Sequence, residues 1–90
     1  MKENFYGLEL VMTCGACPEQ YDVFKDGKKV AYFRLRHGHF TADCPDCMKD
    51  LVYESYPEGD GIFAGEEERS RELTNACEAV DKWIKNNEKQ

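Results

Sequence analysis

The heptapeptide VAYFRLR, residues 30–36, alternates between two kinds of side chain. Ala31, Phe33 and Leu35 share one side of an extended chain, because successive side chains of a strand point to opposite faces. The other side is more polar and holds Val30, Tyr32, Arg34 and Arg36. We therefore predict a central strand over residues 30–36 whose apolar face lies toward the core.

Turn signals and shorter strand patterns flank this segment. Asp26-Gly27 precedes it and is typical of a type I′ hairpin, in which both central residues take positive φ. Gly38 follows it and permits a second tight turn. The remaining patterns predict a turn-rich loop at 14–20 and strands over 8–13, 21–25, 40–43 and 51–56. This order predicts an antiparallel β-meander of three to five strands.

The C-terminal part of the chain has the periodicity of a helix. Apolar residues recur at intervals of three and four over residues 66–87, which predicts an amphipathic helix. Its apolar stripe consists of Leu73, Ala76, Cys77, Val80, Trp83 and Ile84. Three glutamates open the helix and lysines close it, as the helix dipole favours. The loop before it, residues 57–65, is rich in glycine, and Ile62 and Phe63 are predicted to anchor it.

These elements predict an α+β fold in which one C-terminal α-helix packs across the meander. Ninety residues form a single domain, 1–90. Phe33 and Leu35 of the central strand are predicted to meet the apolar stripe that contains Trp83 in the core. An aromatic content of 12% argues against disorder, because aromatic rings supply large buried areas.

Charge and hydropathy narrow the class of protein. The net charge is −6, of which residues 51–90 carry −5, with five Lys and Arg against ten Asp and Glu. This acidic half disfavours nonspecific binding to nucleic acid, which depends on cationic side chains. No apolar run approaches the ~18 residues of a membrane span, and the first residues lack the apolar core of a secretion signal. We therefore expect no membrane partner and a cytoplasmic location, where disulfides are rare.

Five cysteines then need another explanation, and four of them form two Cys-x-x-Cys pairs. Cys14 and Cys17 make the first pair, Cys44 and Cys47 make the second, and 26 residues separate the two. A two-residue spacer lets two thiolates bind one metal ion, and Zn²⁺ prefers four such ligands in a tetrahedron. The sequence therefore predicts a candidate zinc site on these four cysteines.

Two alternatives to zinc remain open. In the first, the pairs comprise two small buried thiols and two exposed ones, with no metal. In the second, one pair performs thiol–disulfide chemistry, although neither pair clearly precedes a helix that would lower a thiol pKa. Cys77 lies on the apolar stripe of the helix and is predicted to be a core residue.

The segment RLRHGH, residues 34–39, carries the strongest binding signal. A sheet face that presents arginine, tyrosine and histidine can bind nucleic acid or an acidic protein surface. The predicted binding surface consists of Lys28, Lys29, Arg34, Arg36, His37 and His39. The alternative is a solvated face whose arginines pair with carboxylates of the same chain.

No catalytic motif is apparent, so we expect a binding protein rather than an enzyme. His37 and His39 could serve as a general base, but no serine or cysteine is spaced to suggest a triad with them. The first hypothesis is an interaction module with a protein partner, stabilised by zinc if zinc binds. The second is a nucleic-acid-binding domain that uses the face of residues 25–39. A third is an acidic inhibitor that mimics DNA.

The segments CGACPEQYDVF, VAYFRLRHGHF, PDC and VYESYPEGDGIF, followed by the acidic start of the helix, resemble a family of small uncharacterised proteins from bacteria and their phages. The resemblance covers about residues 14–72 and is most specific in RLRHG and YPEGDG. It implies a bacterial or phage origin, a setting that suits a compact binding module. It implies no activity, because none is assigned to that family.

Overall fold

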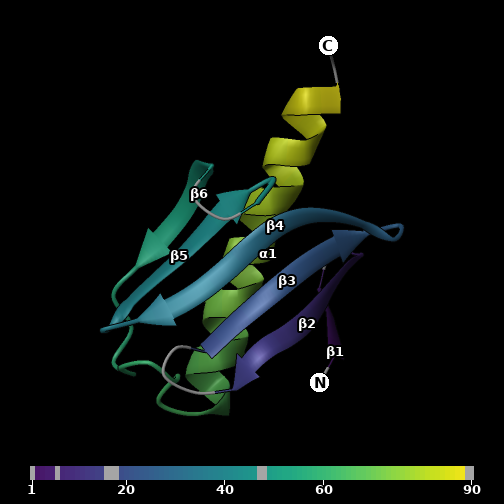
Figure 1. Ribbon diagram of the computed structural model, residues 1–90. Helices are drawn as coiled ribbons and strands as arrows, with labels where there is room; N and C mark the ends of the chain where they lie inside the picture. Colours follow the sequence, from purple (N-terminus) through teal and green to yellow (C-terminus); the bar gives the residue numbers. More distant parts are fainter. Residues whose placement is uncertain (1, 6, 16–18, 47–48, 89–90) are drawn as a thin grey trace.

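The computed structural model describes residues 2–5, 7–15, 19–46 and 49–88. Within these ranges it contains one sheet and one helix (Figure 1). The elements are β1 (Lys2–Phe5), β2 (Leu8–Gly15), β3 (Glu19–Lys25), β4 (Lys28–Arg36), β5 (His39–Cys44), β6 (Asp50–Ser55) and α1 (Glu66–Glu88). All neighbouring strands are antiparallel, in the order β1-β2-β3-β4-β5-β6. The predicted α+β meander with one C-terminal helix is confirmed, and β1 adds a strand that its short sequence did not indicate.

Two turns set the register of the central strand. Asp26 and Gly27 have φ angles of 53° and 80°, and His37 and Gly38 have 53° and 71°. Positive φ at both central residues is what a type I′ turn requires, because its twist matches that of the flanking strands. The hairpin predicted at Asp26-Gly27 is therefore confirmed, and the turn at Gly38 has the same backbone form.

The inner face of the sheet, which packs against α1, carries the core. Ala31, Phe33 and Leu35 of β4 are fully buried, as their alternation predicted. Figure 1 shows α1, coloured green to yellow, lying behind the sheet and crossing it. The buried residues of the helix are Leu73, Ala76, Cys77, Val80 and Ile84, together with Glu68 and Glu72. Phe33 and Leu35 share one buried cluster with this stripe, as predicted, and Trp83 is partly buried against that cluster.

The glycine-rich loop between β6 and α1 follows a narrow path. Phe63 is buried at 5% exposure and packs on Phe40, with ring centroids 5.1 Å apart. Ile62 is 43% exposed, so only one of the two predicted anchors fills the core. A Cβ atom at Gly59 would lie 2.1 Å from the carbonyl oxygen of Ile62, so the loop has no room for a side chain there.

The outer face of the sheet points away from α1. Gln20, Tyr32, Arg34 and Thr41 on this face are all partly exposed, and in the described ranges no helix or strand packs over them (Figure 1). A sheet that is packed on one side and open on the other presents a broad surface for contact with another molecule. No helix among the described residues has the length and apolar character needed to cross a membrane.

Candidate binding surface

Strand register places several polar side chains beside the two arginines of β4. Arg34 pairs with Gln20 of β3 and with Thr41 of β5, and Arg36 pairs with His39. Directly paired residues of antiparallel strands project from the same face. Arg34, Arg36 and His39 therefore lie together on the outer face, near the end of the sheet where β4 turns into β5.

The lysines of the predicted binding surface lie at the other end of β4 from this group. Lys28 and Lys29 begin β4 and Arg36 ends it, so a strand rise of ~3.3 Å per residue separates Lys28 from Arg36 by roughly 26 Å. His37 is exposed and occupies the turn that follows β4. The structure thus divides the predicted surface into a lysine end, a turn histidine and an arginine end.

The arginines and the lysine differ in how their charges are matched. Lys29 forms ion pairs with Asp22 at 3.1 Å and Asp46 at 2.9 Å, and it lies over the ring of Tyr32. Hydrogen bonding to Asp46 is the main cause of a raised Lys29 pKa, and Asp22 adds to it. Neither Arg34 nor Arg36 makes an ion pair with any described residue. Among the described residues of this surface, Lys29 and His39 contact carboxylates of the chain, and the pairing expected for the arginines is not seen.

An aromatic stack completes the arginine end. The rings of His39 and Tyr56 are nearly parallel, with centroids 4.7 Å apart and an interplanar angle of 6°. The Nε2 atom of His39 lies 2.9 Å from the Glu54 carboxylate. Tyr56 is 76% exposed, the most exposed of the large apolar and aromatic residues described. Sequence reasoning missed it, although the alternation of β6 continues one residue beyond Ser55.

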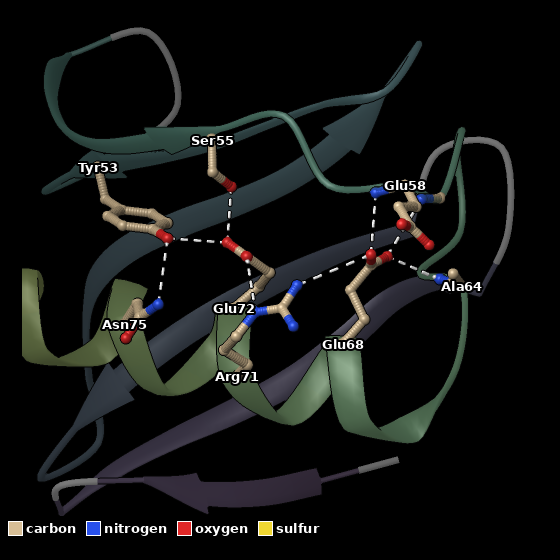
Figure 2. A network of polar contacts seen from close by, with 9 residues as sticks. Tyr53, Ser55, Glu58, Ala64, Glu68, Arg71, Glu72 and Asn75 are labelled. Carbon is tan, nitrogen blue, oxygen red and sulfur yellow. Dashed lines mark hydrogen bonds and ion pairs between the residues drawn. The ribbon is translucent and has the colours of Figure 1, made fainter.

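The chain on both sides of Tyr56 is bound to α1 by buried carboxylates. Ser55 and Tyr53 donate hydrogen bonds of 2.6 and 2.8 Å to the Glu72 carboxylate (Figure 2). The Arg71 side chain donates to the same carboxylate at 3.4 Å. Glu72 is buried, so these donors replace the water that its charge would otherwise need. The last residues of β6 are therefore held at a fixed distance from the helix.

Glu68 holds the other side. Its carboxylate accepts backbone N–H bonds from Ala64 at 2.8 Å, Glu58 at 2.9 Å and Gly59 at 3.1 Å (Figure 2). Burial alone would raise the pKa of Glu68, but the three backbone bonds outweigh it and hold the pKa below its ordinary value. One side chain thus satisfies three amides of the loop and fixes the chain that follows Tyr56.

A third carboxylate joins the start of β3 to the start of the helix. Glu19 is fully buried and receives two hydrogen bonds from Arg69, at 2.8 and 3.0 Å. The Tyr21 hydroxyl and the Phe63 amide also donate to it. Burial acts to raise the pKa of Glu19, but hydrogen bonds from Arg69 and Tyr21 outweigh it and the pKa is lowered. The arginine end of the outer face is therefore built on a rigid base.

The cysteine pairs are described only in part. Cys17 and Cys47 lie outside the described residues, and for Cys14 only the backbone position in β2 is described. Cys44 ends β5 and is fully buried. Burial, with smaller contributions from Asp43 and Asp50, raises the pKa of the Cys44 thiol to about 12.

Two strands stand between the described parts of the two pairs. Cys14 lies in β2 and Cys44 in β5, and β3 and β4 separate these two strands by about 14 Å at the ~4.8 Å spacing of neighbouring strands. The register aligns Cys14 with Thr41, so Cys44 also lies three residues further along its strand. Among the described residues, no three His, Cys, Asp or Glu side chains gather so as to hold a metal ion. The four-cysteine zinc site stays a prediction from sequence.

Comparison with known proteins adds no relative. No protein-family model, no curated protein and no solved structure matches this chain. The resemblance to small bacterial and phage proteins stays a prediction, and function has to be argued from the surface itself.

Proposed function

We propose that this protein is a small binding module that contacts a negatively charged partner through the arginine end of its outer face. This surface, called here the arginine patch, consists of Arg34, Arg36, His39 and Tyr56. The observation that carries the proposal is that neither arginine pairs with a described carboxylate, in a chain whose net charge is −6. Both guanidinium groups therefore stay available to an external anion.

The chemistry of arginine supports this choice of surface. A guanidinium group presents its donors in a planar fork that fits a carboxylate or a phosphate with two hydrogen bonds. Of the carboxylates on this face, Glu54 is in contact with His39, and Asp22 and Asp43 are the cross-strand neighbours of Tyr32, with Asp22 paired to Lys29. Much of the acidic charge lies on α1, on the other side of the sheet, beginning with Glu66, Glu67 and Glu68. The patch is thus a local site of positive charge on an acidic protein.

The setting proposed for this module is the cytoplasm of a bacterium or an infecting phage's host. The resemblance noted in RLRHG and YPEGDG supports the origin, and the rarity of disulfides in a reducing compartment agrees with the thiol form of Cys44. Under this proposal the protein acts by binding its partner, and it catalyses no reaction.

A charge-matched pair of variants tests the proposal. We expect the wild-type protein to bind fluorescent heparin at low salt and the double variant Arg34→Ala/Arg36→Ala to bind at least about tenfold more weakly, because charge-assisted hydrogen bonds are lost. The control is Lys82→Ala/Lys85→Ala on α1, which removes the same charge from two exposed side chains. Equal affinities for both double variants, measured by fluorescence anisotropy, would show that the patch is not the site.

A further inference from the structure

We propose that the partner of the arginine patch is a single-stranded nucleic acid, with one base stacked on Tyr56 and neighbouring phosphates bound by Arg36 and Arg34. This inference rests on the proposed function and names the class of anion. The proposed function is argued from charge, whereas this inference also uses the exposed aromatic stack beside the arginines.

The stack is suited to receive a third ring. Tyr56 lies parallel to His39 and yet remains 76% exposed, so most of its surface is free for further contact. Every nucleobase has a π face, and base–aromatic stacking is therefore tolerant of sequence. In a duplex each base is already stacked between its neighbours, whereas an unpaired base can be turned toward a protein ring. The exposed ring therefore favours a single strand over a duplex.

The arginines lie where the backbone of such a strand would pass. Arg36 is the cross-strand neighbour of His39, which carries the stack. Arg34 is two residues away on the same strand face, a rise of ~6.6 Å, so the two long side chains can reach successive phosphates. A base on Tyr56 and phosphates on the arginines thus engage adjoining parts of one nucleotide chain.

The same geometry disfavours an acidic peptide at this position. The face of an aromatic ring carries negative electrostatic potential, so a carboxylate gains nothing by approaching Tyr56. A nucleobase gains dispersion and stacking there, while its phosphate satisfies the arginines. The stack distinguishes two anions that the arginines alone would treat alike.

The network beneath the patch reduces the cost of binding. Ser55 is held by Glu72 and Glu58 by Glu68, so the backbone on either side of Tyr56 is fixed before any ligand arrives (Figure 2). A surface that is already ordered loses less conformational entropy on association. A binding role for Tyr56 would therefore explain why its side chain is exposed while the backbone around it is bound to the helix by buried carboxylates.

Three ligands of similar charge separate stacking from electrostatics: the octathymidylate (dT)8, an abasic oligonucleotide of the same length, and an octaglutamate peptide. We expect wild-type protein to bind (dT)8 most tightly. Tyr56→Ala should weaken (dT)8 binding roughly 5- to 150-fold, the usual range for one stacked base, and leave abasic binding unchanged. Tyr56→Phe keeps the ring and should bind as the wild type does.

Salt dependence reports the number of phosphates. Two phosphates neutralised on a single strand predict a slope of about −1.4 for log affinity against log salt concentration. Arg34→Ala/Arg36→Ala should reduce that slope toward zero. Tyr56→Ala should keep it, because the tyrosine carries no charge. Circular dichroism and melting temperature check that each variant is folded, which we expect for Tyr56 because its side chain is mostly exposed.

The outcomes separate the two proposals. If the abasic strand binds as tightly as (dT)8, or if octaglutamate binds more tightly, the nucleic-acid inference is overturned. The proposed function stands in that case, provided that the arginine variant loses binding to the anion. If the wild-type protein binds none of the three ligands at low salt, both proposals are wrong.

Discussion

The carboxylate of Glu19 has no exposure to solvent, and its charge is matched by Arg69, fifty residues further along the chain. A buried ion pair adds little net stability over an apolar pair, because both charges lose their water. Removing one partner is different, since the remaining charge is left buried and unpaired. Glu19 is therefore a point at which one substitution has a large effect on the fold.

We predict that Arg69→Met lowers the free energy of unfolding by about 3–5 kcal/mol at neutral pH, since it leaves the Glu19 charge buried without its partner. Urea denaturation followed by circular dichroism measures the loss. The double variant Glu19→Gln/Arg69→Met removes both charges and should recover part of it. A double variant less stable than Arg69→Met would contradict the assignment of a buried, unpaired charge.

The pH dependence of the stability of Arg69→Met provides a second test of the buried ion pair. The pKa of Glu19 in the folded protein lies below its ordinary value of 4.5. Its ionisation therefore stabilises the fold above pH 4.5, and this contribution is lost as the pH falls through the folded pKa. The difference between wild type and Arg69→Met should accordingly shrink in acid. A difference that stays constant from pH 7 to pH 3 would assign the loss to packing.

At the scale of elements, local patterns predict what local forces determine. The alternation of Ala31, Phe33 and Leu35 predicts the inner face correctly, because the order of apolar and polar residues within a single strand is enough to identify its buried side. Asp26-Gly27 predicts its turn because positive φ is a property of those two residues. Gly15 and Glu19 belong to strands although the sequence favours a loop there. These two residues pair with each other across β2 and β3, and the turn propensity of the individual residues does not predict such a pairing.

The loop of residues 57–65 is held by contacts that leave no local signal. Glu68 follows two other glutamates, Glu66 and Glu67, at the start of α1, and nothing in the sequence marks it as the one that turns inward. The glycine at Gly59 is explained by the carbonyl of Ile62, which is close enough to exclude a Cβ atom. The exposure of Ile62 and the burial of Phe63 were equally undetermined, because both residues are apolar.

We predict that Glu68→Ala loosens this loop without removing the helix. The amides of Glu58, Gly59 and Ala64 lose their shared acceptor, and the buried Gly59 amide costs roughly 1–3 kcal/mol when it has no partner. Hydrogen–deuterium exchange should become faster at these three amides while the central turns of α1 remain protected.

The neighbouring residue supplies the control for that measurement. Glu67 is exposed and belongs to the same acidic first turn, so Glu67→Ala removes an equal charge near the helix dipole. Loop exchange should stay at the wild-type rate in Glu67→Ala. Equal acceleration in both variants would mean that charge at the helix start, and not the three hydrogen bonds, holds the loop.

For the whole molecule, the candidate site arises from the order of the strands. The sequence places Arg34 and Arg36 on one strand face, and the structure confirms that the opposite face of β4 is buried. It does not indicate that Tyr56 stacks on His39, because these residues are brought together by the pairing of β5 with β6. It also does not indicate that Lys29 is paired while Arg34 and Arg36 make no ion pair with a described residue, since Asp22 and Asp46 come from two other segments.

The zinc prediction, which the described residues leave untested, belongs to the same scale. Cys44 is part of the continuous core between the sheet and α1, and β3 and β4 separate its strand from that of Cys14. A metal bound by both pairs would have to draw Cys44 out of this core, at the cost of the apolar contacts that its strand makes there. We therefore expect protein purified without added metal to contain less than one zinc per chain by native mass spectrometry.

Thermal unfolding with and without a strong chelator completes this test, with reducing agent present throughout. We expect one melting temperature under both conditions, because the core and the Glu19–Arg69 pair hold the fold. The variant Cys77→Ser is the control for loss of a buried thiol that belongs to neither pair. Stoichiometric zinc together with a lower melting temperature in chelator would instead establish the four-cysteine site, and the metal would then be a determinant of stability for the whole sheet.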